Sequence, residues 1–466
     1  MKQLYIYLIT GIIFIASACD FSDEINVSPA IPEDVSAQSI VPAAQAGLAW
    51  VVGGELVRLS GLFTQQFIGI NAQQADNYRY LFISADADGM WRRMYVSALQ
   101  PLVIVREKAL EDGSNHTAAM ADVLIAHGLG SLTDVFGDIP YTTAFGAEEM
   151  NFQPTYDTQE EVYATIHSLL DEAIATLNGD AGNGTALGSE DLIYGGNTAA
   201  WVAAAYSLKA KYYLRTTKIN SNAYSEAESA LANAITSSAG DFQLSFGNNP
   251  NEPNPAYQFS QDRAGNINID PSFFNLLNNL NDPRRGALFL LDESDTPDPS
   301  GFSKTFDAGT FYTAINAPVI LTSFVEMKFI EAEIELMGNA DVTAAEAALA
   351  EAISASIIKL TGSDDAAYAT ANSALAGLTD NDARLEQIMA QKYIAMYSNG
   401  IEPWTDFRRT GFPALSPNAN GVNSFNLNGE IPRRASYPQT EIDLNRVNVP
   451  IKDANLQTPV WWDDAP

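Results

Sequence analysis

Residues 322–360 read TSFVEMKFIEAEIELMGNADVTAAEAALAEAISASIIKL, two helical patterns joined by a short polar turn. Each pattern carries three apolar or small residues on a single helix face: Phe329, Ala332 and Leu336 in the first, and Ala345, Leu349 and Ala352 in the second. Small residues let one helix lie close against the next, which is typical of a tetratricopeptide unit. An ordinary helical bundle produces the same triplets, so both interpretations stay open.

The same i, i+4, i+7 spacing recurs in two other segments, at Ile166, Leu170 and Ala173 and at Ala227, Leu231 and Ala234. Apolar periodicity predicts helices over the following ranges: 43–67, 91–110, 116–135, 158–177, 198–216, 224–235, 322–337, 343–360 and 382–398. Two of these ranges begin with a Thr-x-x-Glu capping box, Thr158 with Glu161 and Thr343 with Glu346. The sequence therefore predicts a mainly α fold.

Long stretches between the helices have no helical period and are rich in Asn, Gly, Pro and aromatic residues. They cover residues 178–197, 241–271, 291–318 and 412–466, and the Gln/Asn/Tyr-rich segment 73–84 also has a loop-like composition. Loops of this length in a compact protein are usually functional surfaces or disorder, and the aromatic residues argue against pure disorder. We expect a helical scaffold that displays a face built from loops.

Composition excludes several classes of protein. Of the 466 residues, 25 are Lys or Arg and 57 are Asp or Glu, so the formal net charge is -32, which argues against nucleic-acid binding. Hydrophobic residues make up 46%, as in a folded globule. A single cysteine excludes an internal disulfide framework and a cysteine-based zinc cluster, and three histidines leave little for a histidine-rich metal site.

The N-terminus has the pattern of an export signal. Lys2 precedes an apolar run of about 15 residues, too short for a bilayer span of ~20, that ends in small residues before Cys19. We predict a signal peptide over 1–18, a tether over 19–41 and one domain over 42–466. Cys19 is the expected site of lipidation, as in a bacterial lipobox; the alternative is a free or buried thiol. The acidic cluster after Cys19 is either an export signal to the outer face or a plain linker.

Several segments, taken in order, resemble the SusD/RagB family of nutrient-binding outer-membrane lipoproteins, nearest to its starch-binding-associated branch. They are WRRMY (91–95), TDVFGDIPY (133–141), DLIYGG (191–196) with Trp201, NDPR (281–284), PVILT (318–322) with EAE (331–333), GIEPW (400–404) with RRTGFP (408–413), IPRR (431–434) with YP (437–438), and WW (461–462). Any one of these motifs is weak, but their order together with the lipobox makes the match specific.

The resemblance implies a SusD-like fold with tetratricopeptide-like helix pairs, anchored at the cell surface over a TonB-dependent, SusC-like outer-membrane transporter. The protein would hand that transporter a captured nutrient, most simply an oligosaccharide or polysaccharide, without catalysis and without a cofactor. The alternatives are a surface-anchored glycan-degrading enzyme and a tetratricopeptide-type scaffold that binds only protein. The motifs of common hydrolases, metallopeptidases and nucleotide-binding proteins are missing from the sequence.

A sugar site needs flat aromatic faces for stacking, and planar amide or guanidinium groups that bond to hydroxyls. Family analogy favours Arg79 and Trp91 as ligand contacts. The further candidates are aromatic residues of the predicted loops: Tyr78, Tyr80, Tyr257, Phe259, Phe302 and Tyr312, with Phe311 beside the last of these. An aromatic residue that opens a helix is more often core than platform, and both roles stay open for Trp91. Asp86-Ala87-Asp88-Gly89 is a calcium-like fragment without the rest of an EF-hand loop, and no metal site is predicted.

Overall fold

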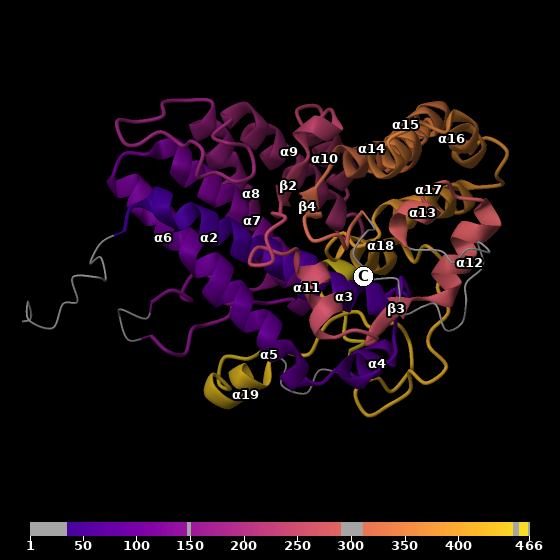
Figure 1. Cartoon of the computed structure of the whole chain (residues 1–466), viewed down its shortest axis with the longest axis horizontal. Coiled ribbons are helices and arrows are strands. Elements are labelled where there is room, and N and C mark those ends of the chain that lie inside the picture. The colour runs from indigo at the N-terminus through magenta and orange to yellow at the C-terminus, as the bar shows by residue number, and fades with distance from the viewer. Residues whose placement is uncertain (1–34, 147–150, 290–310, 451–455, 465–466) are drawn as a thin grey trace, which may run out of the picture.

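A computed structural model describes residues 35–146, 151–289, 311–450 and 456–464 (Figure 1). The predicted signal peptide, most of the tether, Cys19 and Phe302 lie outside these ranges. Helices make up most of the described chain, and the only strands form two small antiparallel pairs within it, β1 with β3 and β2 with β4. The prediction of a mainly α fold is confirmed.

In the first half of the chain the elements are α2 (Ala37–Trp50), η2 (Val51–Leu56), α3 (Val57–Phe63), β1 (Phe67–Gly69), α4 (Ala72–Tyr78), α5 (Ser84–Arg93), η3 (Met94–Leu99), α6 (Gln100–Glu111), α7 (Asn115–Phe136), α8 (Gln159–Leu177), α9 (Thr198–Arg215), α10 (Ala223–Leu231), η4 (Ser238–Gly240) and β2 (Phe242–Ser245). In the second half they are α11 (Pro255–Asp262), β3 (Ile267–Ile269), α12 (Pro271–Leu280), α13 (Arg285–Leu288), β4 (Pro318–Thr322), α14 (Phe324–Glu333), η6 (Ile334–Gly338), α15 (Val342–Thr361), α16 (Ala366–Ser373), α17 (Asn381–Ala395), α18 (Glu402–Thr410), α19 (Gln439–Leu444) and η7 (Trp461–Asp463).

The core is organised around α7, which packs between α6 and α8 (Figure 1). From Thr117 to Phe136 every residue of α7 is buried. By length and composition, α7 and the rod Ala37–Phe63 could each cross a membrane, but helices of this kind also form the cores of globular proteins, and both are largely buried inside this fold. We therefore read them as core helices.

The helix pair predicted from residues 322–360 is present as α14 and α15, which pack directly against each other. The six residues of the two predicted stripes are all fully buried, and they belong to one hydrophobic cluster. The stripe on α8, from Ile166 to Ala173, is likewise buried in the main core. The third stripe is confirmed only in part: Ala227 and Ala234 are buried, but α10 ends at the half-buried Leu231, so Ala234 lies beyond the helix. The apolar spacing therefore identified the packing faces of α8, α14 and α15 correctly, in agreement with tetratricopeptide-like helix pairs.

Three local predictions are wrong. The segment 73–84 is not a loop, because α4 covers most of its first half and α5 begins at its end. The stretch 241–271 contains β2, α11 and β3. The Thr343/Glu346 capping box does not form: the Asp341 side chain caps α15, and Glu346 instead accepts bonds from two backbone amides near α16. The box at Thr158 and Glu161 is confirmed.

The paired arginines of the sequence are held inside the fold rather than exposed as ligand clamps. Arg284 bonds to Asp282 at 2.6 Å, and Arg409 bonds to Glu333 and, at 3.1 Å, to Asp406. All of these side chains are buried, so each ion pair satisfies charges that would otherwise be unpaired in the interior. Ion pairing therefore explains the positions of Arg284 and Arg409.

Two wide, π-helical segments interrupt the long helices. η2 joins α2 to α3, and η3 joins α5 to α6, with helical backbone on both sides. A π-helical turn holds one residue more per hydrogen-bonded ring than an α-helical turn, and such turns are frequent at functional sites. Each of the two cavities described below is lined in part by one of them.

Candidate functional site

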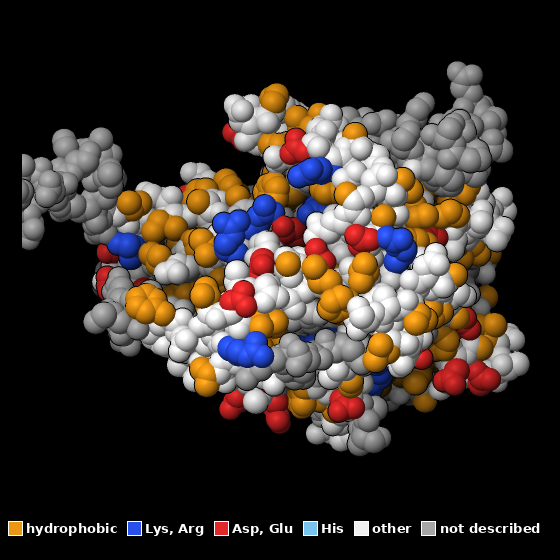
Figure 2. Space-filling model, turned by 90° about the horizontal axis from the view of Figure 1, so that it is seen from below, with side chains coloured by type: hydrophobic (Ala, Val, Ile, Leu, Met, Phe, Trp, Pro, Cys, Tyr) orange, Lys and Arg blue, Asp and Glu red, His pale blue; other side chains and the backbone are white. Residues whose placement is uncertain are grey.

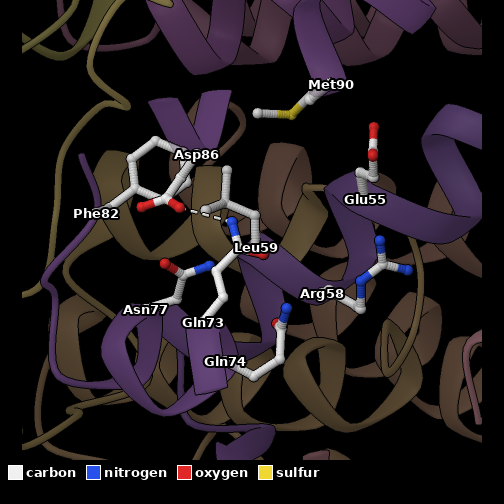
Figure 3. Close-up of a pocket in the computed structure, with 9 residues that line it drawn as sticks. All are labelled: Glu55, Arg58, Leu59, Gln73, Gln74, Asn77, Phe82, Asp86 and Met90. Atoms are coloured by element: carbon white, nitrogen blue, oxygen red, sulfur yellow. Dashed lines mark hydrogen bonds between the residues drawn. The ribbon is translucent and has the colours of Figure 1, made fainter. Parts of the chain in front are cut away.

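A small polar pocket lies where the rod of η2 and α3 meets α4 and α5. It has a volume of about 70 Å³, which is enough for several water molecules or for one polar group of a larger ligand. Its lining residues, called the polar pocket below, are Glu55, Arg58, Leu59, Gln73, Gln74, Asn77, Phe82, Asp86 and Met90. Figure 3 shows their side chains around a common space, with Glu55 and Arg58 on one side and the α4 residues on the other.

Three polar groups of this pocket have no hydrogen-bond partner in the part of the chain that the structure describes. Oε2 of Glu55 and Oδ1 of Asn77 are buried without a hydrogen bond to a described residue, and Asn77 is only 6% exposed. Arg58, which is half-buried, forms no hydrogen bond or ion pair with any residue that the structure describes. Buried polar groups are nearly always paired, so three unpaired groups around one space indicate a ligand or ordered water.

Burial lowers the pKa of the Arg58 guanidinium to about 10, because the charged form loses its hydration; Glu55 opposes this shift, and the positive charge of Arg93 adds to it. Arg93 itself bonds to Oε1 of Glu55 at 2.6 Å and holds that carboxylate in place. A guanidinium that is poorly solvated and has no ionic partner gains strongly from a ligand oxygen.

Aromatic faces flank these polar groups. The guanidinium carbon of Arg58 lies 4.3 Å from the centroid of the Phe259 ring, and that of Arg93 lies 5.4 Å from the Trp50 ring. Both rings are half-buried, so each keeps some exposed area. Aromatic faces beside planar hydrogen-bonding groups are the combination that a sugar ring requires.

The polar pocket can satisfy a group that both donates and accepts hydrogen bonds. The Glu55 and Asn77 oxygens accept, whereas the Arg58 guanidinium only donates. A hydroxyl does both, and a compound with several hydroxyls can meet all three at once. The neighbouring carboxylate of Asp86 is already occupied: it accepts from Gln73 at 2.6 Å and from the Ile83 amide at 2.9 Å, which caps α5.

A second, larger cavity lies on the other side of α5, and its volume is about 450 Å³, within the range of small-molecule sites. Its lining residues, called the aromatic cleft below, are Asp88, Gly89, Trp91, Arg92, Tyr95, Val96, Pro140, Ala144, Pro154, Thr440 and Glu441. Trp91 is 6% exposed, and it packs against Phe136, Tyr156 and Tyr437. It is thus mainly a core residue that also forms part of the wall of a cavity.

The other predicted site residues fall in different surroundings. Tyr80 is fully buried, with its hydroxyl accepting from the Asn418 amide at 3.1 Å, and Tyr312 is 6% exposed and packs on Phe311. Burial raises the pKa of both hydroxyls. As platforms for a ligand these two were wrongly predicted, because their rings fill the interior.

Tyr78 is half-buried and donates to Asp270 at 2.7 Å; burial, then Asp270, raise the pKa of its hydroxyl. Arg79 ends α4 and bonds to Asp76, with 47% of its side chain exposed. It does not line the polar pocket, although the adjacent α4 does. Tyr257 is half-buried on α11, two residues before Phe259 on the same helix.

The calcium-like fragment has structural partners. Asp86 caps α5, and Asp88 accepts from the amide and the hydroxyl of Thr440, both at 2.9 Å, which ties α19 to α5. Within the residues that the structure describes, no group of three or more His, Cys, Asp or Glu side chains is placed to hold a metal ion.

Sequence reasoning missed Glu55 and Arg58. A signal was available for both, since they are charged residues three apart in an otherwise apolar run from Leu48 to Leu59. The pocket is also lined chiefly by helical residues, contrary to the expected face built from loops. α3 contacts α4, and Arg58 of α3 contacts Phe259 of α11. Local sequence patterns do not predict such tertiary contacts.

Comparison with known proteins agrees with this architecture. The profile of the SusD-like family, described as "Starch-binding associating with outer membrane", matches residues 30–438. No curated protein matches the chain. A SusD/RagB family protein from Bacteroides thetaiotaomicron superposes with a TM-score of 0.77 at 24% identity, covering 93% of this chain and 100% of that one. A chitin-binding SusD homolog from Flavobacterium johnsoniae gives 0.74 at 23%, covering 91% and 99%. A structure titled a chitin-binding protein gives 0.74 at 21%, covering 92% and 100%.

Proposed function

Because the chain belongs to the SusD-like family of starch-binding proteins that associate with the outer membrane, we propose that it captures a glycan at the cell surface. The polar pocket holds hydroxyls of the glycan, and a TonB-dependent transporter receives the ligand unaltered. Cys19 carries the lipid that anchors the protein. These assignments join the family's described role to the chemistry of the site in this chain.

The observation that carries the proposal is that Glu55 Oε2, Asn77 Oδ1 and the Arg58 guanidinium lie around one space. The two oxygens are buried without a hydrogen bond to a described residue, and Arg58 is held only on the Phe259 ring. Together they offer donors and acceptors that a sugar hydroxyl would satisfy. Phe259, which was a candidate from the sequence, does not line the polar pocket; its ring lies under the Arg58 guanidinium and orients that group. Two of the structures with this fold are named as chitin-binding, which supports a glycan as the class of ligand.

The non-catalytic role is part of the proposal. Hydrolysis of a glycoside usually requires two carboxyl groups across the scissile bond, one of them protonated. In the polar pocket, Glu55 is bonded to Arg93, and Asp86 is occupied by Gln73 and the helix cap. Neither carboxylate is placed to act as a free acid. The pocket is therefore suited to binding rather than to bond cleavage.

The test is binding of the mature chain to a panel that includes starch, chitin and other polysaccharides, by affinity electrophoresis and calorimetry. Retardation by at least one glycan, with no release of reducing ends during long incubation, is expected. Release of reducing ends would establish the enzyme alternative. Association with a protein partner but with no glycan of the panel would favour the scaffold alternative and would overturn the proposal.

Anchoring and delivery need separate measurements. Metabolic labelling with a fatty acid should label the native protein and leave a Cys19→Ser variant unlabelled. Purification from solubilised outer membranes should recover a TonB-dependent transporter with the native protein. An unlabelled native protein would contradict the anchor, and a protein recovered alone would contradict the proposed partner, without affecting the glycan-binding proposal.

A further inference from the structure

Three apolar side chains, called the apolar tip below, project into solvent beside the aromatic cleft. They are Phe152, which is 74% exposed, Leu444 at the end of α19, which is 70% exposed, and Val447, which is 75% exposed. No other large apolar side chain of the described residues is as exposed as these three. Exposed apolar groups that lie together on a folded protein mark a surface that another molecule covers.

Hydrogen bonds join the two segments that carry the apolar tip. The Gln153 side chain donates to the Leu444 carbonyl at 2.8 Å, and the Asn445 side chain donates to the Pro154 carbonyl at 2.9 Å. Phe152 is therefore held beside the end of α19, although the two segments are far apart in the chain. The apolar tip is one surface that is built from both of them.

The aromatic cleft lies next to the apolar tip. Pro154, two residues after Phe152, forms part of the wall of the cleft, and so does Glu441, three residues before Leu444 on α19. Two residues span at most about 7 Å, so the tip and the cleft are adjacent. Figure 2 shows the molecule from below, the side on which α19 lies in Figure 1, and apolar side chains lie there among charged ones of both signs.

The aromatic cleft can receive a ring from another molecule. Its volume of about 450 Å³ is ample for one phenyl group, and the Phe152 ring of the same chain does not line it. The side chains of Trp91 and Tyr95 form part of its wall, and aromatic rings attract one another in edge-to-face and offset arrangements. The exposed Val96 adds apolar surface at the opening.

We propose that this face binds a second copy of the chain, in a two-fold dimer in which Phe152 of each copy enters the aromatic cleft of the other. A two-fold interface buries the same patch on both subunits, so that patch must be complementary to itself. A projecting ring beside a ring-lined hollow meets this requirement within a single chain. The inference goes beyond the proposed function and does not depend on it, because the apolar tip does not line the polar pocket.

The area that such a dimer buries is sufficient for a weak association. A buried aromatic side chain removes about 150–250 Å² from solvent, and the wall that it covers loses a similar area. The two equivalent contacts together therefore bury roughly 600–1,000 Å². Leu444 and Val447 bring the total to the ~1,000 Å² of a specific interface at the low end of the size range. We expect a Kd on the order of 10–100 μM.

Charge opposes this association over long distances and favours it locally. Each chain carries a formal net charge of -32, so two copies repel each other. On the face to be covered, however, Arg92 and Arg446 are exposed and form no hydrogen bond or ion pair with any described residue. Salt screens the long-range repulsion, so association is measured at about 0.5 M NaCl.

Sedimentation velocity over about 1–300 μM protein tests the dimer. The mature chain is used with Cys19→Ser, so that neither a lipid nor a disulfide links two copies. This parent protein should pass from monomer to dimer as its concentration rises. Phe152→Asn should weaken the association at least about tenfold. Ile358→Asn is the control and should leave it unchanged, because Ile358 is an exposed apolar residue of α15, far from α19 in Figure 1. Thermal unfolding should show that both variants are folded.

A mixing experiment separates the contact of ring and cleft from unspecific apolar association. Ala144 lines the aromatic cleft, so Ala144→Trp fills the cleft while Phe152 is kept. Neither Phe152→Asn nor Ala144→Trp can form the contact with another copy of itself. A mixture of the two restores one contact of the pair, since Phe152 of one variant meets the open cleft of the other. The equimolar mixture should therefore associate more strongly than either variant alone.

Three results would overturn the dimer. They are a parent protein that stays monomeric up to about 300 μM, an association that Phe152→Asn leaves intact, and a mixture that associates no better than its components. None of these results affects glycan binding at the polar pocket. A native protein that binds no glycan of the panel would in turn overturn the proposed function and leave the dimer standing.

Discussion

The guanidinium of Arg58 lies over the face of the Phe259 ring, 4.3 Å from its centroid, although the two residues are about two hundred positions apart in the chain. A cation held on an aromatic face is oriented without an anionic partner. Arg58 is therefore fixed in direction and is still free to bond to a ligand. This arrangement makes it the residue through which binding at the polar pocket is best tested.

We predict that Arg58→Ala lowers affinity for the bound glycan by about ten- to a hundredfold, since a hydrogen bond to a charged group contributes roughly 1.5–3 kcal/mol. Calorimetry measures this effect. Arg79→Ala is the matched control, because Arg79 is exposed and pairs with Asp76 outside the pocket. Loss of affinity in Arg79→Ala but not in Arg58→Ala would contradict glycan binding at the polar pocket. It would instead support Arg79, which family analogy favoured, as the ligand contact.

Substitution of Trp91 should affect stability more than binding. Its ring packs on those of Phe136, Tyr156 and Tyr437, so Trp91→Ala removes a large buried side chain and should destabilise the protein by about 3–5 kcal/mol. Urea unfolding followed by circular dichroism measures the change. Trp91→Phe keeps most of the packing and is the variant for binding studies. An unfolding midpoint unchanged in Trp91→Ala would show that the ring is not part of the core.

The cap of α15 allows a direct test of a corrected prediction. The Asp341 side chain accepts from the amides of Thr343 and Ala344, both at 3.0 Å. Asp341→Ala should therefore cost about 1 kcal/mol of stability, whereas Thr343→Ala should cost only a few tenths. Thermal unfolding of the two variants measures the difference. The reverse order would mean that the Thr343 capping box forms in solution.

Stability should fall in mild acid because His127 is buried. Burial, with smaller contributions from Lys211 and Arg215, lowers the pKa of its imidazole to about 3, against an ordinary 6.5. The unfolded chain then takes up the proton first, so stability present above about pH 6.5 is lost as the pH falls toward 3, by up to about 2 kcal/mol at pH 5.

Urea unfolding at pH 7 and pH 5 measures this loss, and a His127→Gln variant should lose less than the native protein over the same interval. Glu326 acts in the opposite direction, because burial raises the pKa of its carboxyl. The change in unfolding free energy between pH 7 and pH 5, compared between the native protein and the variant, separates the effect of His127 from that of Glu326. The same change in both proteins would show that His127 is not held neutral inside the fold.

The parts of the fold that were predictable have strong apolar periodicity. The helices at α7, α8 and α15 were found within about two residues, because each buries a regular stripe or a whole surface. α4 and α11 were missed, since they are short, polar and stabilised by contacts with distant segments. Helix α5 was predicted to begin at Trp91 but begins at Ser84, where Asp86 supplies a cap that the apolar pattern does not record.

The site was harder to predict than the fold for a physical reason. Residue type indicates that an aromatic ring can stack on a sugar, but only the tertiary structure decides whether the ring is accessible. Tyr80 and Tyr312 turned inward, whereas Phe259 stayed half-exposed beside Arg58. Glu55 and Arg58 lay in a run that hydropathy assigned to the core. The polar pocket around these two residues is completed by α4. This is a tertiary contact, and sequence spacing does not predict it.

The wide turn at η2 has a consequence for how specificity could change. Removing one amino acid between Val51 and Leu56 would let ordinary α-helical winding continue from α2 into α3. Because the wide turn already holds the extra residue, α2 and α3 would keep their orientations, and Arg58 would stay over Phe259. A single-codon loss would thus rewind only the backbone that presents Glu55 and would alter one wall of the polar pocket.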